Sequence, residues 1–218
     1  MKTALVFGSS GLIGGHLLNE LIQSDNYNKI KLFVRSDYGS IHSKTEIIKT
    51  DFNNLENHKE DIKGDDCFFC IGTTKQNSPD KNEYKRVELD VPKKIAQIAK
   101  SNLVNSFVFV SSGYADPNSS GDYLNFKGLV EEELKRLSFS KLGIMRPSFL
   151  MGDRKEKRVG EKVGIFIFKL LSPLFLGPLK KMKPIQSEKV AKAMIKISNG
   201  DFIQQIFESN EIVEISNN

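Results

Sequence analysis

Short apolar runs alternate with longer amphipathic stretches along this chain. The apolar runs are rich in Val, Ile and Phe and predict buried strands, while the stretches between them repeat apolar residues at helical spacing. The strands are predicted at 2–8, 29–35, 45–51, 65–72, 105–113, 141–149 and 203–208, and the helices at 11–23, 54–62, 82–100, 122–137 and 187–198. Strands that alternate with helices favour a parallel sheet covered on both faces. We therefore predict an α/β fold with a doubly wound parallel sheet of about seven strands, in one domain spanning 1–218.

Composition narrows the class of protein without identifying it. Of the 218 residues, 39% are hydrophobic and 27% are charged, which is typical of a globular chain with a substantial core. The formal net charge is +5, but basic residues are interspersed with acidic ones. Nucleic acid is therefore not expected as a partner.

The sequence gives no sign of a metal site, a disulfide or a membrane span. Cys67 and Cys70 are three residues apart in a predicted strand and would face opposite sides of it. The N-terminal apolar run is too short for a secretory signal. Lys169, Pro173 and Pro178 interrupt the longest apolar stretch, at 163–179, so we expect no transmembrane segment, and a peripheral membrane contact is a minor alternative. These features favour a cytoplasmic location.

Glycines crowd the turn between the first predicted strand and the first predicted helix. Gly8, Gly11 and Gly14 are three residues apart, and Gly15 follows them. In a Rossmann-type sheet the pyrophosphate of a dinucleotide lies at this turn, because helix amides attract it and missing side chains let it approach. A merely tight turn is the alternative. We expect cofactor contacts from Gly8, Ser10, Gly11, Leu12, Ile13 and Gly14.

The end of the second strand indicates which dinucleotide would bind. An acidic residue there would favour the free ribose of NAD(H), whereas this chain has Arg35 followed by Ser36. A guanidinium suits the 2′-phosphate of NADP(H). We therefore predict a preference for NADP(H), with NAD(H) as the alternative because Asp37 could take the ribose role.

The ends of the third and fourth strands should reach the same crevice. Asp51 and Phe52 follow the third strand, where a carboxylate and a ring could flank the adenine. Ile71, Gly72 and Thr73 follow the fourth strand, and the glycine permits close approach of the backbone. All five residues are predicted to contact the cofactor.

A group with acid/base chemistry follows the fifth strand. Ser111 and Ser112 end that strand, and Tyr123 and Lys127 share one face of the next helix. An ammonium near a phenol stabilises the phenolate and makes it useful for proton transfer, while a serine hydroxyl can hold the substrate oxygen. Packing or a solvated helix face is the alternative for this spacing. We predict Ser112, Tyr123 and Lys127 as the catalytic residues, with Ser111 as the substitute for Ser112.

The segments "GSSGLIGG", "IGTT", "FVFVSSG" and "YLNFK", in this order, resemble the short-chain dehydrogenase/reductase superfamily. More narrowly, "DDCFFCIGTTKQ", "KRVELD", "YLNFKGLVEEELKRL" and "IMRPSFLMGDR" resemble its atypical, NADPH-binding branch of Tat-interacting-protein-like oxidoreductases. The resemblance implies that the tyrosine exchanges the proton, the lysine binds the nicotinamide ribose and the serine orients the substrate. It also implies nicotinamide-side contacts from Pro147 and Ser148. Glu88 stands where many members have an asparagine that supports a proton relay.

The chain after Lys127 is too short for the large lobe with which nucleotide-sugar epimerases and dehydratases hold a second nucleotide. Its remaining substrate-side segment, 150–185, contains the apolar stretch 163–179. We therefore expect a small or apolar carbonyl substrate for an NADPH-dependent reductase, with core packing as the alternative role of the apolar stretch. An NmrA-like NADP(H)-sensing protein without turnover is the alternative function. The sequence leaves monomer and homodimer open.

Overall fold

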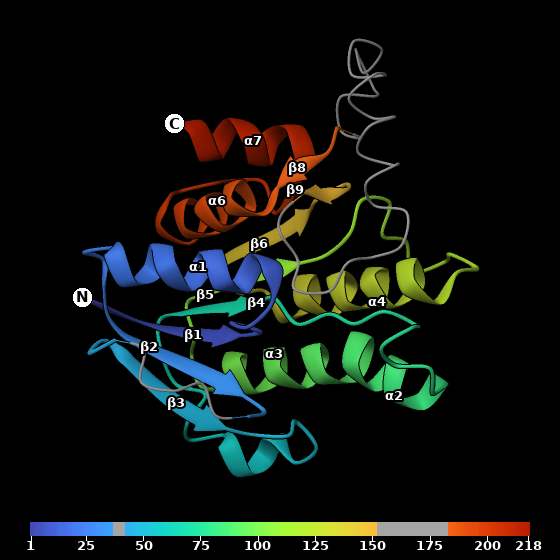
Figure 1. Ribbon diagram of the computed structural model, residues 1–218, viewed down its shortest axis with the longest axis horizontal. Helices are drawn as coiled ribbons and strands as arrows, with labels where there is room; N and C mark the ends of the chain where they lie inside the picture. The colour runs from blue at the N-terminus through green and yellow to red at the C-terminus, as the bar shows by residue number, and fades with distance from the viewer. Residues whose placement is uncertain (37–41, 152–182) are drawn as a thin grey trace.

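The computed structural model describes residues 1–36, 42–151 and 183–218, and its centre is a parallel sheet of seven strands (Figure 1). The strand order is β3-β2-β1-β4-β5-β6-β9. The predicted doubly wound sheet is therefore confirmed. The strands are β1 (Lys2–Phe7), β2 (Tyr27–Val34), β3 (Thr45–Lys49), β4 (Asp66–Phe69), β5 (Ser106–Val110), β6 (Lys141–Arg146) and β9 (Ile206–Glu208).

Helices cover both faces of the sheet (Figure 1). On one face lie α1 (Leu12–Gln23), α6 (Ser187–Asn199) and α7 (Ser209–Asn217), and on the other lie α3 (Val91–Ser101) and α4 (Asp122–Leu137). Neighbouring strand residues point to opposite faces. Val6 and Phe68 accordingly pack in the cluster under α1 and α6, whereas Phe7 and Phe69 pack in the cluster under α3 and α4.

The strand order places a switch point at the centre of the sheet. β1 pairs with β2 on one side and with β4 on the other, so the chain leaves β1 outward in one direction and later returns to fill the opposite side. The connections that follow β1 and β4 therefore diverge at the carboxyl ends of these strands. Such a point is where open α/β sheets bind ligands.

The helix predicted over 82–100 is interrupted. It consists of α2 (Lys81–Lys85), a π-helical turn η2 (Arg86–Asp90) and α3. The Val91 amide donates to the Arg86 carbonyl five residues earlier, and Pro92 has no N–H with which to continue an ordinary ladder. The insertion of one extra residue into this turn explains the difference.

Other boundaries also differ from the prediction. The polar helix expected at 54–62 is a 3₁₀ turn, η1 (Leu55–His58), and the last strand is shorter than 203–208. Helix α7 was not predicted; its start has a capping box in which Glu208 and Glu211 each bond the other's backbone N–H. The short pair β7 (Leu150–Met151) and β8 (Ile185–Gln186) stands at the two ends of the predicted substrate-side segment 150–185, most of which lies outside the described residues.

Gly14 sets how closely α1 approaches the turn after β1. A Cβ at Gly14 would overlap the Gly8 carbonyl, whereas a Cβ at the neighbouring Gly15 would stand 3.7 Å from the nearest atom, the Ser9 carbonyl oxygen. We expect Gly14→Ala to lower the free energy of unfolding by about 1–3 kcal/mol, the usual cost of overpacking. The matched variant Gly15→Ala should be neutral or stabilising by up to about 1 kcal/mol, since alanine is the better helix former. Urea unfolding of both variants measures this, and equal stability of the two would contradict it.

Candidate active site

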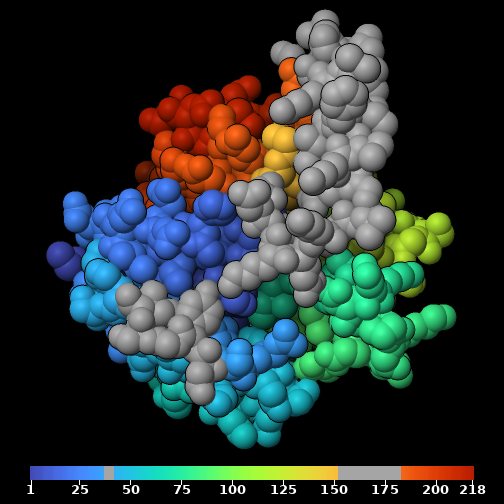
Figure 2. Space-filling view, in the orientation of Figure 1, coloured from blue at the N-terminus to red at the C-terminus, as the bar shows by residue number. Residues whose placement is uncertain are grey.

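A pocket of about 320 Å³ lies at the carboxyl ends of β1, β2 and β4, beside the switch point. Its lining comes from N-terminal residues and from residues around α2, which are blue and green in the space-filling view (Figure 2). The pocket is therefore where the order of the strands predicts a ligand. The predicted cofactor residues that line it are Gly8, Ser10, Gly11, Arg35, Phe52, Ile71, Gly72 and Thr73.

The backbone of the glycine turn borders this pocket. Gly8 has a φ of +90°, and a Cβ there would lie 2.8 Å from the Cys70 carbonyl carbon, so the turn after β1 touches the end of β4. Helix α1 begins directly after Gly11 and has no acidic residue in its first turn. Leu12, Ile13 and Gly14 do not line the pocket, but they form that first turn, whose amides have no partner within the helix.

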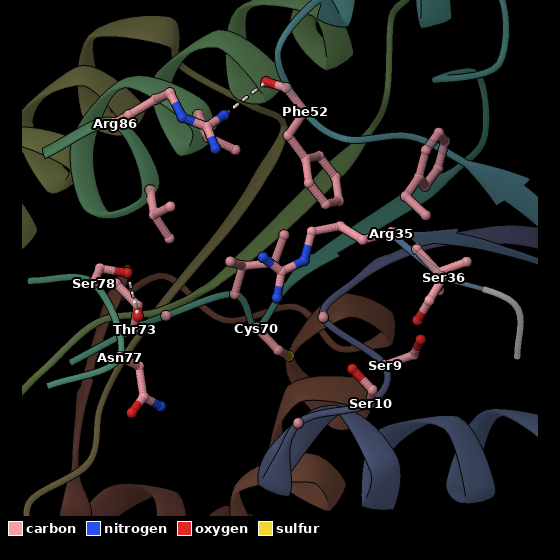
Figure 3. Close-up of a pocket in the computed structure, with 18 of the residues that line it drawn as sticks. Ser9, Ser10, Arg35, Ser36, Phe52, Cys70, Thr73, Asn77, Ser78 and Arg86 are labelled. Carbon is pink, nitrogen blue, oxygen red and sulfur yellow. Dashed lines mark hydrogen bonds between the residues drawn. The ribbon is translucent and has the colours of Figure 1, made fainter. Parts of the chain in front are cut away.

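Ser9 adds a polar atom that needs a partner. Its side chain is fully buried, and its hydroxyl has no hydrogen-bond partner in the described part of the chain. Ser9 also lines the pocket beside Ser10 (Figure 3). An unpaired hydroxyl, free helix amides and a glycine turn together fit the anionic pyrophosphate of a dinucleotide.

The Arg35 side chain extends into the middle of the pocket, with Phe52 on one side and the serines of the glycine turn on the other (Figure 3). Arg35 is exposed at the end of β2. Its charge also acts on Glu83, whose pKa is held below its usual range first by the hydrogen bond from Arg86 and further by Arg35. A cation is thus available in this pocket. Asp37, the alternative partner for a ribose, lies outside the described residues.

Asp51 does not line the pocket. Its two carboxylate oxygens accept hydrogen bonds from the Asn53 amide at 2.9 Å and from Asn53 Nδ2 at 2.8 Å, and these bonds lower the pKa of Asp51. Phe52 alone enters the pocket, from a left-handed backbone conformation with a φ of +65°. The carboxylate that we predicted beside the adenine is therefore hydrogen-bonded within its own turn.

Several lining residues were missed by the sequence analysis. Arg86 donates to both oxygens of Glu83, at 2.7 and 2.8 Å, and to the Phe52 carbonyl at 3.3 Å. Thr73 Oγ1 and Ser78 Oγ are 2.9 Å apart across the loop after β4. Nothing in the local pattern distinguishes Ser78 from an ordinary loop residue or Arg86 from an ordinary helix surface, because only long-range packing brings them to the pocket.

Tyr123 and Lys127 lie one helical turn apart on α4, as the spacing predicts. The Lys127 ammonium is 5.9 Å from the Tyr123 ring centroid and 4.9 Å from that of Phe109, and it donates to the Val110 carbonyl at 3.2 Å. Lys127 is 3% exposed whereas Tyr123 is 39% exposed. The amine is thus fixed in the interior beneath an accessible phenol.

Glu88 faces the same ammonium from η2. Glu88 Oε2 lies 3.1 Å from Lys127 Nζ, and Glu88 Oε1 accepts a hydrogen bond of 2.5 Å from the Thr73 amide. Burial is the largest single effect and disfavours the charged form of Lys127, but the charges and hydrogen bond of Glu88 together with Tyr123 and Glu131 outweigh it, so the pKa of Lys127 is raised above its usual value. Glu88 therefore joins the Lys127 side of the site to the loop that lines the pocket.

The two serines at the end of β5 have different surroundings. Ser111 is buried and donates to Glu131 Oε1 at 2.5 Å, and Glu131 is also held by Arg146 through two contacts of 2.6 and 3.0 Å. Ser112 is partly exposed, and its hydroxyl contacts only the Gly113 carbonyl, at 3.3 Å, within the described residues. Of the two hydroxyls, the one on Ser112 is the more accessible.

Pro147 and Ser148 follow β6 and do not line the pocket. The Ser148 amide donates to Ser209 Oγ at 2.7 Å, and its hydroxyl donates to the Lys183 carbonyl at 2.5 Å. These bonds tie the turn after β6 to α7 and to the strand β8. The geometry therefore separates the two residues from the glycine turn and brings them to the far side of the crevice.

The described residues contain neither a metal-binding cluster nor a membrane-spanning helix. They contain no group of three or more His, Cys, Asp or Glu side chains arranged to hold a metal ion. None of their helices combines the length and the hydropathy that a membrane crossing requires. Cys67 is buried and Cys70 lines the pocket, both as free thiols.

Known proteins resemble this chain in sequence and in fold. A family model described as NAD(P)H-binding matches residues 8–199. The protein HTATIP2 of Rattus norvegicus is 32% identical over 168 residues, which cover 73% of this chain and 67% of the rat protein. The protein FMP52 of Eremothecium gossypii, named mitochondrial, is 29% identical over 221 residues, which cover 97% of this chain and 96% of that protein.

Among solved structures, a UDP-N-acetylglucosamine 4-epimerase from Methanobrevibacter ruminantium has a TM-score of 0.71 at 19% identity, covering 98% of this chain and 80% of that one. The enzyme WbmH of Bordetella bronchiseptica, solved with NAD⁺, has a TM-score of 0.70 at 18% identity, covering 100% of this chain and 80% of that one. At this identity the likeness concerns the fold alone.

The comparisons correct one expectation. We expected a cytoplasmic location from the absence of a recognisable signal, but several fungal relatives are named as mitochondrial proteins, among them those of Candida glabrata and Debaryomyces hansenii. The cytoplasmic assignment is therefore wrong, because short apolar runs test for secretion and do not test for organelle import.

The match over most of the chain and the free amides of the glycine turn lead to the same conclusion. This chain belongs to the NAD(P)H-binding family, in a group with the fold of short-chain dehydrogenases that includes HTATIP2 and FMP52.

Proposed function

We propose that this protein is an NADPH-dependent reductase of a small or apolar carbonyl compound, with Ser112, Tyr123 and Lys127 as its catalytic residues. The observation that carries the proposal is the position of the Tyr123–Lys127 pair. It lies at the same edge of the sheet as the dinucleotide pocket, and Glu88 connects Lys127 to Thr73 at the pocket wall.

NADPH, when bound, supplies the hydride, while the protein side chains hold the cofactor, donate the proton and stabilise the charges that develop. The amides at the start of α1 would hold the pyrophosphate, and Arg35 would hold the 2′-phosphate. The Tyr123 hydroxyl would give its proton to the substrate oxygen as that oxygen gains negative charge, and the Ser112 hydroxyl would donate a hydrogen bond to the same atom. The Lys127 ammonium would stabilise the phenolate that Tyr123 becomes.

Exposed aromatic side chains on the segments after β5 and β6 support an apolar substrate. Tyr123, Tyr114 and Phe149 are large side chains that remain 39%, 52% and 56% exposed, on segments that follow β5 and β6. Exposed aromatic groups at a strand-end crevice are suited to the apolar part of a small ligand.

The alternative of an NADP(H)-sensing protein without turnover shares the same pocket. It is supported by the fact that Lys127 is already held by Glu88 and Val110 within the fold itself. The two proposals differ in whether Tyr123 transfers a proton, so substitution of its hydroxyl separates them.

Arg35→Ala tests the preference for the phosphorylated cofactor. We expect its Kd for NADPH to rise about 10- to 100-fold, which corresponds to the loss of charged hydrogen bonds, and its Kd for NADH to change less than about threefold. Calorimetric titration of both cofactors measures this. Arg136→Ala is the matched control, because Arg136 is an exposed arginine of α4 paired with Glu133. The proposal fails if the unmodified protein binds NADH as tightly as NADPH.

Tyr123→Phe tests the proton donor. With any aldehyde or ketone that the unmodified protein reduces, turnover should fall about 10²- to 10⁴-fold while the Kd for NADPH stays within about threefold, because only the hydroxyl is removed. NADPH absorbance follows the reaction. Tyr114→Phe, on the loop after β5, is the matched control: it also removes a phenol hydroxyl but keeps the aromatic ring that would contact an apolar substrate, so its activity should be kept. Unchanged turnover in Tyr123→Phe would exclude the assigned donor, and no turnover with any carbonyl compound would favour the sensing protein.

A further inference from the structure

Glu88 is a buried acid that the proposed chemistry does not use. It is 1% exposed, and each of its two carboxylate oxygens has a different neighbour. Oε1 accepts the Thr73 amide at 2.5 Å, and Oε2 stands 3.1 Å from Lys127 Nζ. A carboxylate taken so completely out of water is strongly disfavoured without a cation beside it. The pair is therefore a unit in which neither charge is stable alone.

The π turn η2 explains how Glu88 reaches this position. One extra residue in the turn changes the direction in which the following side chains point, and π turns of this kind are frequent at functional sites. Within η2, Glu88 and Leu89 are buried while Asp90 is exposed. The irregular turn thus places one of its acids in the interior at the cost of a regular hydrogen-bond ladder.

Charged and titratable groups reach Lys127 from each element around it. Glu88 comes from η2, Cys70 from the end of β4, and Tyr123 and Glu131 from α4 itself, while β5 contributes the Phe109 ring and the Val110 carbonyl. Glu131 is neutralised by Arg146. Burial raises the pKa of the Cys70 thiol to about 12, so it carries no charge near neutral pH. Among these groups, Glu88 contributes most to the compensation of Lys127, ahead of Tyr123 and Glu131.

We propose that Glu88 is a positioning residue that keeps Lys127 as an ammonium at a fixed place in the crevice and ties it to the wall of the dinucleotide pocket. An ammonium has three N–H donors. The Val110 carbonyl takes one of them and Glu88 lies at ion-pair distance, so at least one donor remains for a ligand. The consequence for turnover rests on the proposed function, whereas the consequence for the charge of Lys127 does not.

Two substitutions test which properties of the Glu88 side chain matter. The substitution Glu88→Gln would keep an acceptor for the Thr73 amide and would remove only the negative charge. The substitution Glu88→Asp would keep the charge on a side chain one methylene shorter, which cannot reach both partners without movement. Comparison of the two variants therefore separates the effect of the negative charge from the effect of the side-chain length.

The direct test is the titration of Lys127 in the cofactor-free protein. Protein labelled with ¹³C-lysine gives a separate Cε signal for each lysine, and Lys127→Met assigns the signal of Lys127. In Glu88→Gln we expect the proton affinity of Lys127 to fall at least about ten-fold, because the largest charge that compensates its burial is then gone. Glu133→Gln is the matched control: it removes a largely buried acid of α4 that is paired with Arg136, and it should leave the Lys127 titration unchanged. The same Lys127 titration in Glu88→Gln as in the unmodified protein would overturn the proposal.

Two further measurements keep the test decisive. The Kd of Glu88→Gln for NADPH should approach that of the unmodified protein at low pH and rise as the pH rises and Lys127 loses its proton; a pH dependence identical to that of the unmodified protein would contradict the proposal.

If Glu88→Gln does not fold, the double variant Glu88→Gln/Lys127→Met should fold, since it leaves no unpaired charge. Failure of both variants to fold would also contradict it. Because the NMR titration uses neither cofactor nor substrate, its result stands whether or not a carbonyl compound is reduced.

Discussion

The turn after β1 has room for backbone and for little else, and the site depends on this constraint. Gly8 touches the end of β4, Gly14 lies against the Gly8 carbonyl, and the first amides of α1 have no partner within the helix. A side chain at Gly8 would overlap the end of β4, and one at Gly14 would push α1 away from the Gly8 carbonyl. The other residues of the pocket follow strands that lie on either side of the same switch point.

Buried charge connects the two halves of the site. On the cofactor side, the backbone and the Ser9 hydroxyl offer neutral donors, and Arg35 offers a cation. On the other side, Lys127 is buried with Glu88, and Ser111 is held in the group formed by Glu131 and Arg146. Breaking such a buried pair by removal of one partner costs about 3–5 kcal/mol, so these arrangements resist change. The accessible hydroxyls of Ser112 and Tyr123 lie next to these buried groups.

How well the sequence predicted each part of the site depends on whether the residues that form it are close together or far apart in the sequence. The glycine turn and the Tyr123–Lys127 spacing are local patterns, and their geometry follows from one turn or one helix. Asp51 was assigned to the adenine, but a bond to Asn53, only two residues away, uses its carboxylate. Arg86 reaches the pocket through the packing of an irregular turn that periodicity does not reveal. Helix α7 was missed although its capping acids, Glu208 and Glu211, are visible in the sequence.

A crystal structure of the protein with NADPH tests the central claim most directly. The account predicts the pyrophosphate at the amides that begin α1, the 2′-phosphate at Arg35 and the nicotinamide ribose within hydrogen-bond distance of Lys127. A cofactor bound elsewhere, or one whose nicotinamide end points away from Tyr123 and Lys127, would contradict it.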